Sequence, residues 1–110
     1  MDAWVTQFRR GVVELGVLAA LRDGEAYGYQ IVERLGRVPG LEVTESTVYP
    51  LLARLARDRC VSTRTAPSPS GPPRRYYRLS ETGRKRLDAM AGHWGAVRES
   101  IDRLIQGGNA

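Results

Sequence analysis

The first part of the chain carries two amphipathic segments bounded by turn residues. Along the first segment, apolar residues recur at steps of three or four: Phe8, Val12, Leu15 and Leu18. This spacing is typical of one face of an α-helix and predicts a helix that ends near Arg22. Asp23 and Gly24 then supply a turn, and the pattern predicts a second helix over residues 27–38, ended by Pro39.

A third segment has the clearest helical pattern. Its apolar residues fall at i, i+3, i+4 and i+7: Val48, Leu51, Leu52 and Leu55. The opposite face is mostly polar and basic: Ser46, Thr47, Pro50, Ala53, Arg54 and Arg57. Thr44 or Ser46 can cap the helix, because a hydroxyl accepts a hydrogen bond from the first turn. Pro50 costs a hydrogen bond inside a helix, so we expect either a start at Ser46 or a local kink.

The residues after the third helix predict a β-hairpin. Segments 61–65 and 74–79 are short and β-prone, and the second alternates, with Tyr77 and Leu79 on one face and Arg74 and Tyr76 on the other. The connection 66–73 holds four of the six prolines, so we expect it to project as an unpaired loop. Three helices followed by a hairpin predict a winged helix-turn-helix over residues 1–79, a mostly helical α+β fold.

Residues 80–110 are predicted to form one C-terminal helix. Ser80 offers a hydroxyl cap, and Glu81 places an acid near the positive end of the helix dipole. The apolar residues are then spaced alternately by three and four: Leu87, Met90, Trp94, Val97, Ile101 and Leu104. This is the heptad seam by which two helices pack together. We therefore expect a homodimer whose interface follows this seam.

Size and composition fit one globular domain. The 110 residues are 42% hydrophobic and 26% charged, which is ordinary for a folded chain. No run approaches the ~18 apolar residues of a membrane span, and no secretory signal pattern opens the chain, so we expect a cytoplasmic protein without a membrane partner. Cys60 is the only cysteine. It excludes an internal disulfide and a zinc site of several cysteines, so we expect a buried, inert thiol and no metal or cofactor.

Positive charge is concentrated in the predicted hairpin and its flanks. The formal net charge is +5, and the stretch from Val61 to Leu87 holds seven basic residues against a single acid, Glu81. A solvated surface would account for a charge run by itself. Its position beside the third helix favours the phosphate backbone of a nucleic acid as partner.

The predicted DNA contacts follow from how a helix-turn-helix docks. The N-terminal end of the recognition helix, here the third, reads base edges in the major groove while flanking groups hold phosphates. The candidates are Tyr27, Thr44, Ser46, Thr47, Tyr49, Arg54, Arg74, Arg75 and Tyr76. Arg54 is long enough to reach the backbone, and Arg74 and Arg75 would place positive charge along the minor groove. For Tyr76, ordinary packing is as good an interpretation as a phosphate contact.

Three motifs together resemble the PadR family of bacterial transcription regulators. They are Tyr27-Gly28-Tyr29-Gln30-Ile31, Thr47-Val48-Tyr49-Pro50-Leu51-Leu52 with Arg54-Leu55, and Arg75-Tyr76-Tyr77-Arg78-Leu79-Ser80 with Gly83 and Leu87. The resemblance follows the family's order almost end to end. It implies a homodimer that binds double-stranded DNA at an inverted repeat, usually represses a nearby gene and is often released by a small molecule. The short C-terminus resembles the compact subgroup of the family.

The resemblance also implies an effector site. In some compact members, a tryptophan that matches Trp94 lines a pocket for a flat aromatic ligand at the dimer centre. The candidate residues for a small aromatic ligand here are Phe8, Val12, Trp94 and Val97. Because Trp94 also falls in the heptad seam, plain packing between two copies is the competing interpretation.

Two positions depart from the family's pattern. The family usually has a glycine after the third helix, where the chain needs a left-handed residue, and this sequence has Asp58, Arg59 and Cys60 instead. If the conformation is kept, an arginine there costs about 1 kcal/mol. The acid that commonly follows Leu55 is replaced by Ala56. Neither departure touches the predicted DNA face.

Two other classes of function compete with DNA binding. The chain has one histidine, His93, and no recognisable set of nucleophile, base and orienting group, which argues against an enzyme. A winged helix used for protein or RNA contact is the alternative, because such scaffolds serve many functions. The basic hairpin, the basic face of the third helix and the dimer seam together favour DNA.

Overall fold

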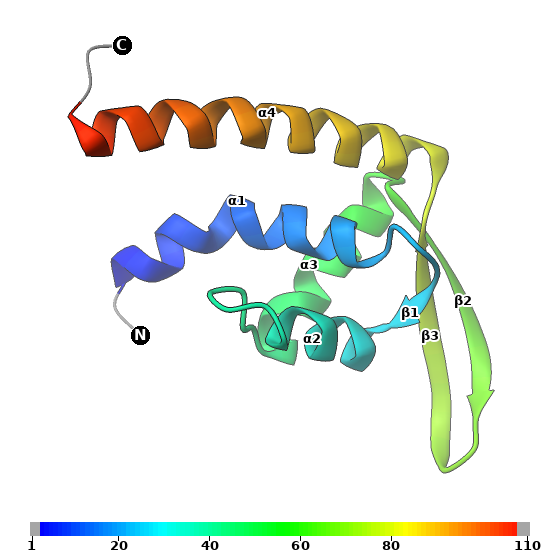
Figure 1. Cartoon of the computed structure of the whole chain (residues 1–110). Coiled ribbons are helices and arrows are strands. Elements are labelled where there is room, and N and C mark those ends of the chain that lie inside the picture. Colours follow the sequence, from blue (N-terminus) through cyan, green and yellow to red (C-terminus); the bar gives the residue numbers. More distant parts are fainter. Residues whose placement is uncertain (1–2, 108–110) are drawn as a thin grey trace.

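The computed structural model describes residues 3–107. Its elements are α1 (Ala3–Ala20), β1 (Ala26–Tyr27), α2 (Gly28–Gly36), α3 (Glu45–Arg57), β2 (Val61–Ser68), β3 (Gly71–Leu79) and α4 (Glu81–Gln106). The strands form an antiparallel sheet in the order β1-β3-β2. In Figure 1 the β2–β3 hairpin projects beyond the three packed helices, and α4 runs alongside α1 at the opposite end. This is the predicted, mostly helical winged helix with a long C-terminal helix.

The core lies between the first three helices and the base of the sheet. Its fully buried side chains come from α1 and the turn after it, α2, α3 and the start of the hairpin: Val17, Leu18, Leu21, Ile31, Val48, Leu52, Leu55 and Cys60. Tyr77 is also buried, as strand alternation predicted, and Cys60 is a buried free thiol, as expected. Each large apolar side chain contributes about 1.5–3 kcal/mol when buried. This burial fixes which face of α3 is left for solvent.

The ends of the first two helices differ from prediction by a few residues. α1 begins at Ala3 and ends at Ala20, two residues before the predicted end. α2 begins at Gly28, because Tyr27 is extended and belongs to β1, a two-residue strand that no sequence pattern indicated. The backbone N–H of Tyr27 donates to Oε1 of Gln30 at 3.1 Å, which satisfies one of the free donors at the helix start.

The start of α3 also differs slightly from prediction. The helix begins at Glu45 with Thr44 at the N-cap position, one residue before the expected start at Ser46, and Pro50 lies inside it. The hydroxyl of Thr44 caps no backbone N–H. It makes a 2.7 Å hydrogen bond with the hydroxyl of Ser46 instead. Both hydroxyls are therefore held together at the exposed end of the helix.

The prediction of an unpaired proline-rich loop at 66–73 was wrong. β2 and β3 pair out to Ser68 and Gly71, and only residues 69–70 form the turn. Between this pair and the pair of Ala66 with Arg74, the single Pro67 lies opposite residues 72–73 in a β-bulge. Pro67 lies on the edge strand β2, and β1 pairs with β3 only at Tyr76 and Tyr77, so the prolines near the tip have no third strand beside them that would need their missing N–H groups. The hairpin is therefore a long, paired wing.

The chain reverses direction after α3 through a left-handed residue, so the conformation is kept although the family's usual glycine is missing. Arg59 has φ of 61° and is the non-glycine residue with positive φ in the described part of the chain. Its N–H donates to the carbonyl of Ala56 at 3.1 Å, and the N–H of Cys60 donates to that of Leu55 at 2.8 Å. These two bonds form a Schellman motif, with Cys60 and Leu55 as its apolar contact.

The start of α4 is attached to the same turn. The N–H of Ser80 donates to the carbonyl of Cys60 at 3.1 Å, and the Ser80 hydroxyl donates to the carbonyl of Arg59 at 2.6 Å. That hydroxyl also accepts from the N–H of Gly83 at 3.0 Å, so Ser80 is the predicted N-cap. A Cβ at Gly83 would lie 1.9 Å from the carbonyl oxygen of Cys60, so only glycine fits there.

Beyond its first turns, α4 leaves its apolar residues uncovered. Gly83 and Leu87 are buried, but later apolar side chains are exposed: Trp94, Val97, Ile101, Leu104 and Ile105. At the other end of the chain, Trp4 and Phe8 on α1 are 66% and 73% exposed. None of the helices in residues 3–107 is long and apolar enough to cross a membrane.

The left-handed turn predicts a stabilising substitution. Arg59→Gly removes the steric penalty of a positive φ, and it should raise the free energy of unfolding by about 0.5–1 kcal/mol. Ala53→Gly is the matched control, because it introduces glycine at an exposed position inside α3 and should cost about the same amount. Urea denaturation of both variants at one protein concentration measures the difference. Equal destabilisation by the two substitutions would contradict the strain at Arg59.

Candidate nucleic-acid interface

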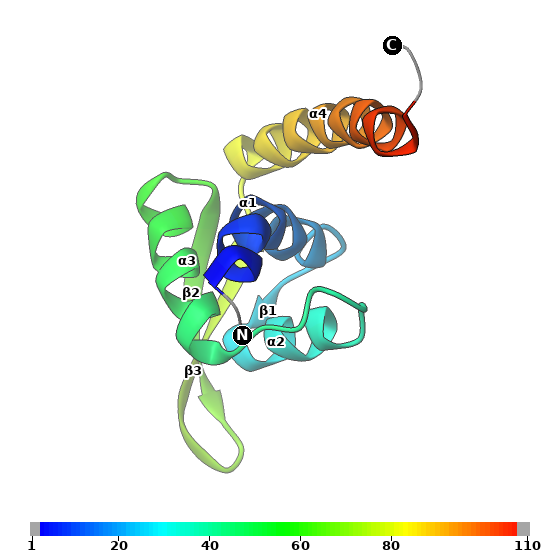
Figure 2. The ribbon, with the colours of Figure 1, turned by 90° about the vertical axis from the view of Figure 1, so that its left-hand side faces the viewer.

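The N-terminal end of α3 and the wing point to the same side of the molecule, away from α4 (Figures 1 and 2). Thr44, Ser46 and Thr47 are exposed at this end of the helix. The buried row of α3 faces the opposite way, which leaves these hydroxyls directed outward. Three of the predicted DNA-contacting residues therefore share one exposed end.

Tyr49 is partly packed against the start of α2. A Cβ on Gly28 would lie 2.3 Å from Cε1 of the Tyr49 ring, so the glycine makes room for that ring. The side chain stays 42% exposed, and burial raises the pKa of its hydroxyl above the ordinary value, with Glu45 and Tyr77 adding to the effect. The second and third helices are thus in direct contact through two residues of the sequence motifs.

The side chain of Arg54 is fixed by an ion pair within the chain. Its guanidinium makes a charge-assisted hydrogen bond to the carboxylate of Glu14 on α1, which raises the pKa of Arg54. The other oxygen of Glu14 lies 3.7 Å from a guanidinium nitrogen of Arg86 on α4. Glu14 therefore links α3 and α4 through α1. The side chain of Arg54 is 46% exposed, so it remains partly open to solvent.

Three side chains line up across the sheet at the base of the wing. Tyr27, Tyr76 and Arg64 are register partners on β1, β3 and β2. The rings of Tyr27 and Tyr76 meet edge to face, with centroids 5.5 Å apart, and the guanidinium carbon of Arg64 lies 4.6 Å from the Tyr76 centroid. Arg74 extends the row, 4.4 Å from the Tyr27 centroid. Stacking of this kind orients a guanidinium and leaves its N–H groups available.

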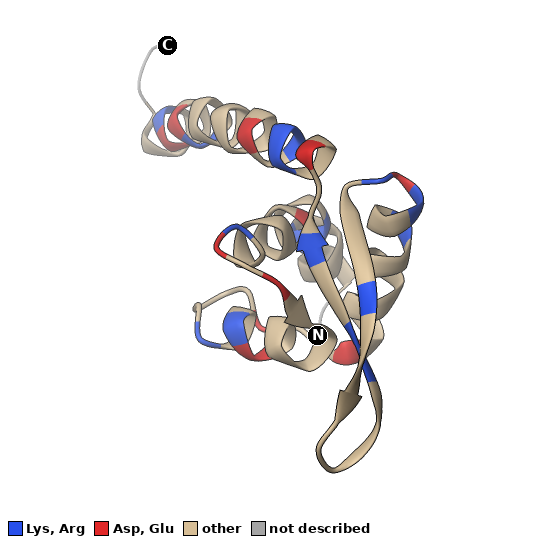
Figure 3. Cartoon of the chain, turned by 90° about the vertical axis from the view of Figure 1, so that its right-hand side faces the viewer, with Lys and Arg blue, Asp and Glu red and all other residues tan. Residues whose placement is uncertain are grey.

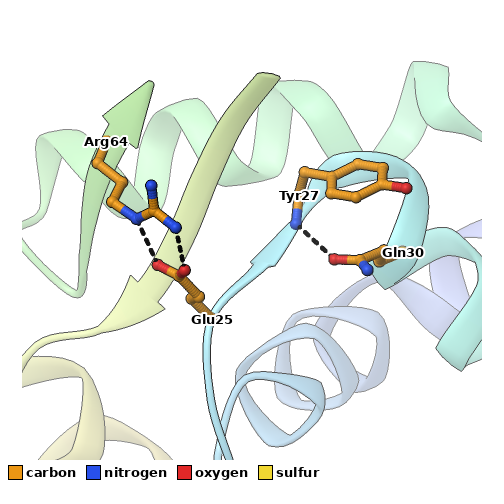
Figure 4. A network of polar contacts seen from close by, with 4 residues as sticks. All are labelled: Glu25, Tyr27, Gln30 and Arg64. Atoms are coloured by element: carbon orange, nitrogen blue, oxygen red, sulfur yellow. Dashed lines mark hydrogen bonds and ion pairs between the residues drawn. The ribbon is translucent and has the colours of Figure 1, made fainter. Parts of the chain in front are cut away.

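A carboxylate binds Arg64 at one end of this row (Figure 4). Glu25, just before β1, accepts two hydrogen bonds from Arg64, one of them from Nε at 2.9 Å. The hydrogen bond from Arg64 lowers the pKa of Glu25. Neither residue was among the predicted site residues. The β-prone segment 61–65 placed Arg64 on a predicted strand, but its partner Tyr76 could not be predicted because the register of the hairpin was unknown.

Arg75 does not share a face with Arg74. Alternation along β3 places Arg74 with Tyr76 on the outer face and Arg75 with the buried Tyr77 on the inner face. Figure 3 shows basic residues along both strands of the wing and none at its tip. The wing thus presents arginines on both faces above an uncharged, proline-rich tip.

The four predicted effector residues surround one hollow between α1 and α4. Its volume is about 550 Å³, and its lining is almost wholly apolar: Phe8, Gly11, Val12, Leu15, Ala89, Met90, His93, Trp94 and Val97. Among the described residues, no group of three or more His, Cys, Asp or Glu side chains could hold a metal ion.

These elements define a class of protein. Three packed helices, an exposed recognition helix and a basic paired wing form a winged helix-turn-helix, here with an added C-terminal helix. Residues 17–89 match the transcriptional regulator PadR-like family, and the chain belongs to this family.

Known proteins resemble the chain over most of its length. A transcriptional regulator of Mycobacterium tuberculosis is 33% identical over 81 residues, which cover 74% of each chain. The structure of a PadR-like transcription factor from Bacteroides fragilis superposes with a TM-score of 0.77 at 33% identity, covering 94% of this chain and 99% of that one. Bacillus subtilis PadR in complex with operator DNA gives a TM-score of 0.66 at 26% identity, over 73% of this chain and 46% of that one.

Proposed function

We propose that this transcriptional regulator is a homodimeric repressor that binds an inverted-repeat operator through α3 and the wing. The observation that carries the proposal is the shared direction of the exposed hydroxyl end of α3 and the basic wing (Figure 2). The Bacillus subtilis relative, whose structure contains operator DNA, has the same fold over 73% of this chain. Family membership supports a role in transcription.

The chemistry of each side chain indicates which part of the DNA it would contact. Ser46, Thr47 and the exposed part of Tyr49 would meet base edges or phosphates in the major groove. Arg74 and Arg75 would meet phosphates or the minor groove, and their opposite faces let one wing contact both walls of that groove. Tyr27 and Tyr76 would act by orienting Arg74 and Arg64. This favours the packing interpretation of Tyr76.

The dimer would cover the apolar face of α4 together with the start of α1. In one copy, Trp94, Val97 and Ile101 are 43%, 39% and 46% exposed along a heptad seam. Exposed apolar surface of this extent marks an interaction site. Two copies of α3 must then reach successive major grooves, about 34 Å apart, to read an inverted repeat. The hollow at Trp94 would lie beside this interface, where a flat aromatic ligand could alter that spacing.

Binding to the promoter DNA of the protein's own gene tests the DNA interface. Thr47→Ala should weaken specific binding roughly fivefold, the worth of one hydrogen bond. Arg74→Ala combined with Arg75→Ala should lower the slope of log affinity against log salt by about two. Lys85→Ala combined with Arg103→Ala removes equal charge on α4, outside the wing and α3, and should leave the slope unchanged. Fluorescence anisotropy over a range of salt measures both quantities, and salt-independent or absent binding would reject the proposal.

The oligomeric state tests the seam. Ile101→Asp with Leu104→Asp should convert the dimer to a monomer, because two charges would be buried against apolar partners. Ala96→Asp with Gln106→Asp adds the same charges on the opposite face of α4 and should leave the dimer intact. Sedimentation velocity distinguishes the species, and a wild-type protein that is monomeric at micromolar concentration would contradict the proposal.

Fluorescence tests the hollow at Trp94. In a Trp4→Phe background Trp94 is the remaining tryptophan, and its emission should change saturably when acridine, a flat aromatic compound, is added. Phe8→Ala should weaken this response at least fivefold by removing a wall of the hollow. Tyr29→Ala, an exposed aromatic on α2, is the control. An unchanged spectrum, or equal responses in both variants, would leave plain packing as the role of Trp94.

A further inference from the structure

A second groove lies between the N-terminal half of α1 and the flank of α3, on the other side of α1 from the hollow at Trp94. It has a volume of about 550 Å³, which is within the range of small-molecule sites. Residues from α1, from the segment before α3 and from α3 itself line it. The groove thus joins the helix that begins the predicted dimer face to the helix predicted to read DNA.

The lining of this groove is strongly basic. Four arginines border it against one acid, Glu42: Arg9, Arg10, Arg54 and Arg57. Arg54 is neutralised by Glu14, and a guanidinium nitrogen of Arg9 donates to the backbone carbonyl of Glu42. Arg10 and Arg57 are exposed, and neither forms an ion pair with any residue in 3–107. Two positive charges therefore face the groove without a carboxylate.

Apolar residues form the floor of the same groove. Val13 is 6% exposed, and Val43 and Leu51 are partly buried against the core. Pro50 adds an apolar wall from α3. A DNA phosphate would engage the arginines at the rim but would leave this floor uncovered. An anion with an apolar body satisfies both parts of the lining.

We propose that the groove between α1 and α3 binds a small organic anion, with its charged group at Arg10 and Arg57 and its apolar body on Val43 and Leu51. This site differs in place and chemistry from the uncharged aromatic hollow at Trp94. The size of the groove and the mixed lining favour an amphipathic carboxylate over a bare inorganic anion.

A bound anion would act on DNA binding directly, a consequence that rests on the proposed function. Thr44 and Thr47 line the groove and also stand at the exposed end of α3. An occupant would place negative charge beside the residues predicted to meet DNA, and it would repel phosphates there. The ligand and the operator should therefore bind in competition.

Calorimetric titration of the full chain with octanoate tests the site without DNA. Wild-type protein should bind octanoate, and Arg10→Gln with Arg57→Gln should weaken binding at least tenfold. Arg22→Gln with Lys85→Gln, which removes equal charge elsewhere, and Trp94→Ala should each change it less than twofold. Octanamide, which lacks the charge, and inorganic phosphate, which lacks the apolar body, should each bind at least tenfold more weakly than octanoate.

Several results would overturn the proposal. These are absence of octanoate binding, equal binding by the groove variant and the wild type, or loss of binding in Trp94→Ala alone. If the groove variant keeps octanoate binding but loses DNA affinity and salt dependence, the groove is a phosphate contact instead. In a parallel arm, octanoate should weaken promoter DNA binding by wild-type protein at least fivefold and leave the groove variant unaffected. Octanoate binding without any DNA binding would support the site and reject the proposed function.

Discussion

The carbonyl of Cys60 is the point on which the rest of the structure depends. It accepts the N–H of Ser80 and lies against Gly83, directly after the left-handed Arg59. One hydrogen-bonded cluster therefore joins four places in the chain: the end of α3, the start of β2, the end of β3 and the start of α4 (Figure 1). Because a Cβ at position 83 would collide with backbone rather than with a movable side chain, this junction has little freedom. The orientations of α3, the wing and α4 are therefore linked at this junction.

A row of contacts of different kinds holds the side chains at the base of the wing in place. An ion pair between Glu25 and Arg64 leads to a cation–π contact with Tyr76, an edge-to-face contact with Tyr27 and a second cation–π contact with Arg74. Each link is weak at an exposed site. Their main effect is to orient the guanidinium groups. A guanidinium that is already stacked loses less conformational entropy when it binds a phosphate.

The two halves of α1 have different roles. Its C-terminal half contributes Val17 and Leu18 to the core, whereas Trp4 and Phe8 in its N-terminal half are among the most exposed apolar residues described. The exposed half forms a wall of both the hollow toward α4 and the groove toward α3. Glu14 lies between these halves and binds Arg54 and Arg86. Ligand binding in the hollow or in the groove would therefore act on a helix that contacts both α3 and α4.

The sequence by itself determined the amphipathic helices, the hairpin and the heptad seam, because each is encoded in local spacing or in short motifs. It also located most candidate contacts on α3 and β3. Whether the turn after α3 stays left-handed without a glycine was decided by the structure, at Arg59. Only the tertiary structure decided the proline-containing pairing of the wing, the strand β1, the row from Glu25 to Arg74, the packing of Tyr49 on Gly28 and the groove between α1 and α3. Apart from the pairing of the wing, which depends on where its bulge falls, these features join segments 12 or more residues apart. Their register follows from how the whole core packs rather than from any local pattern.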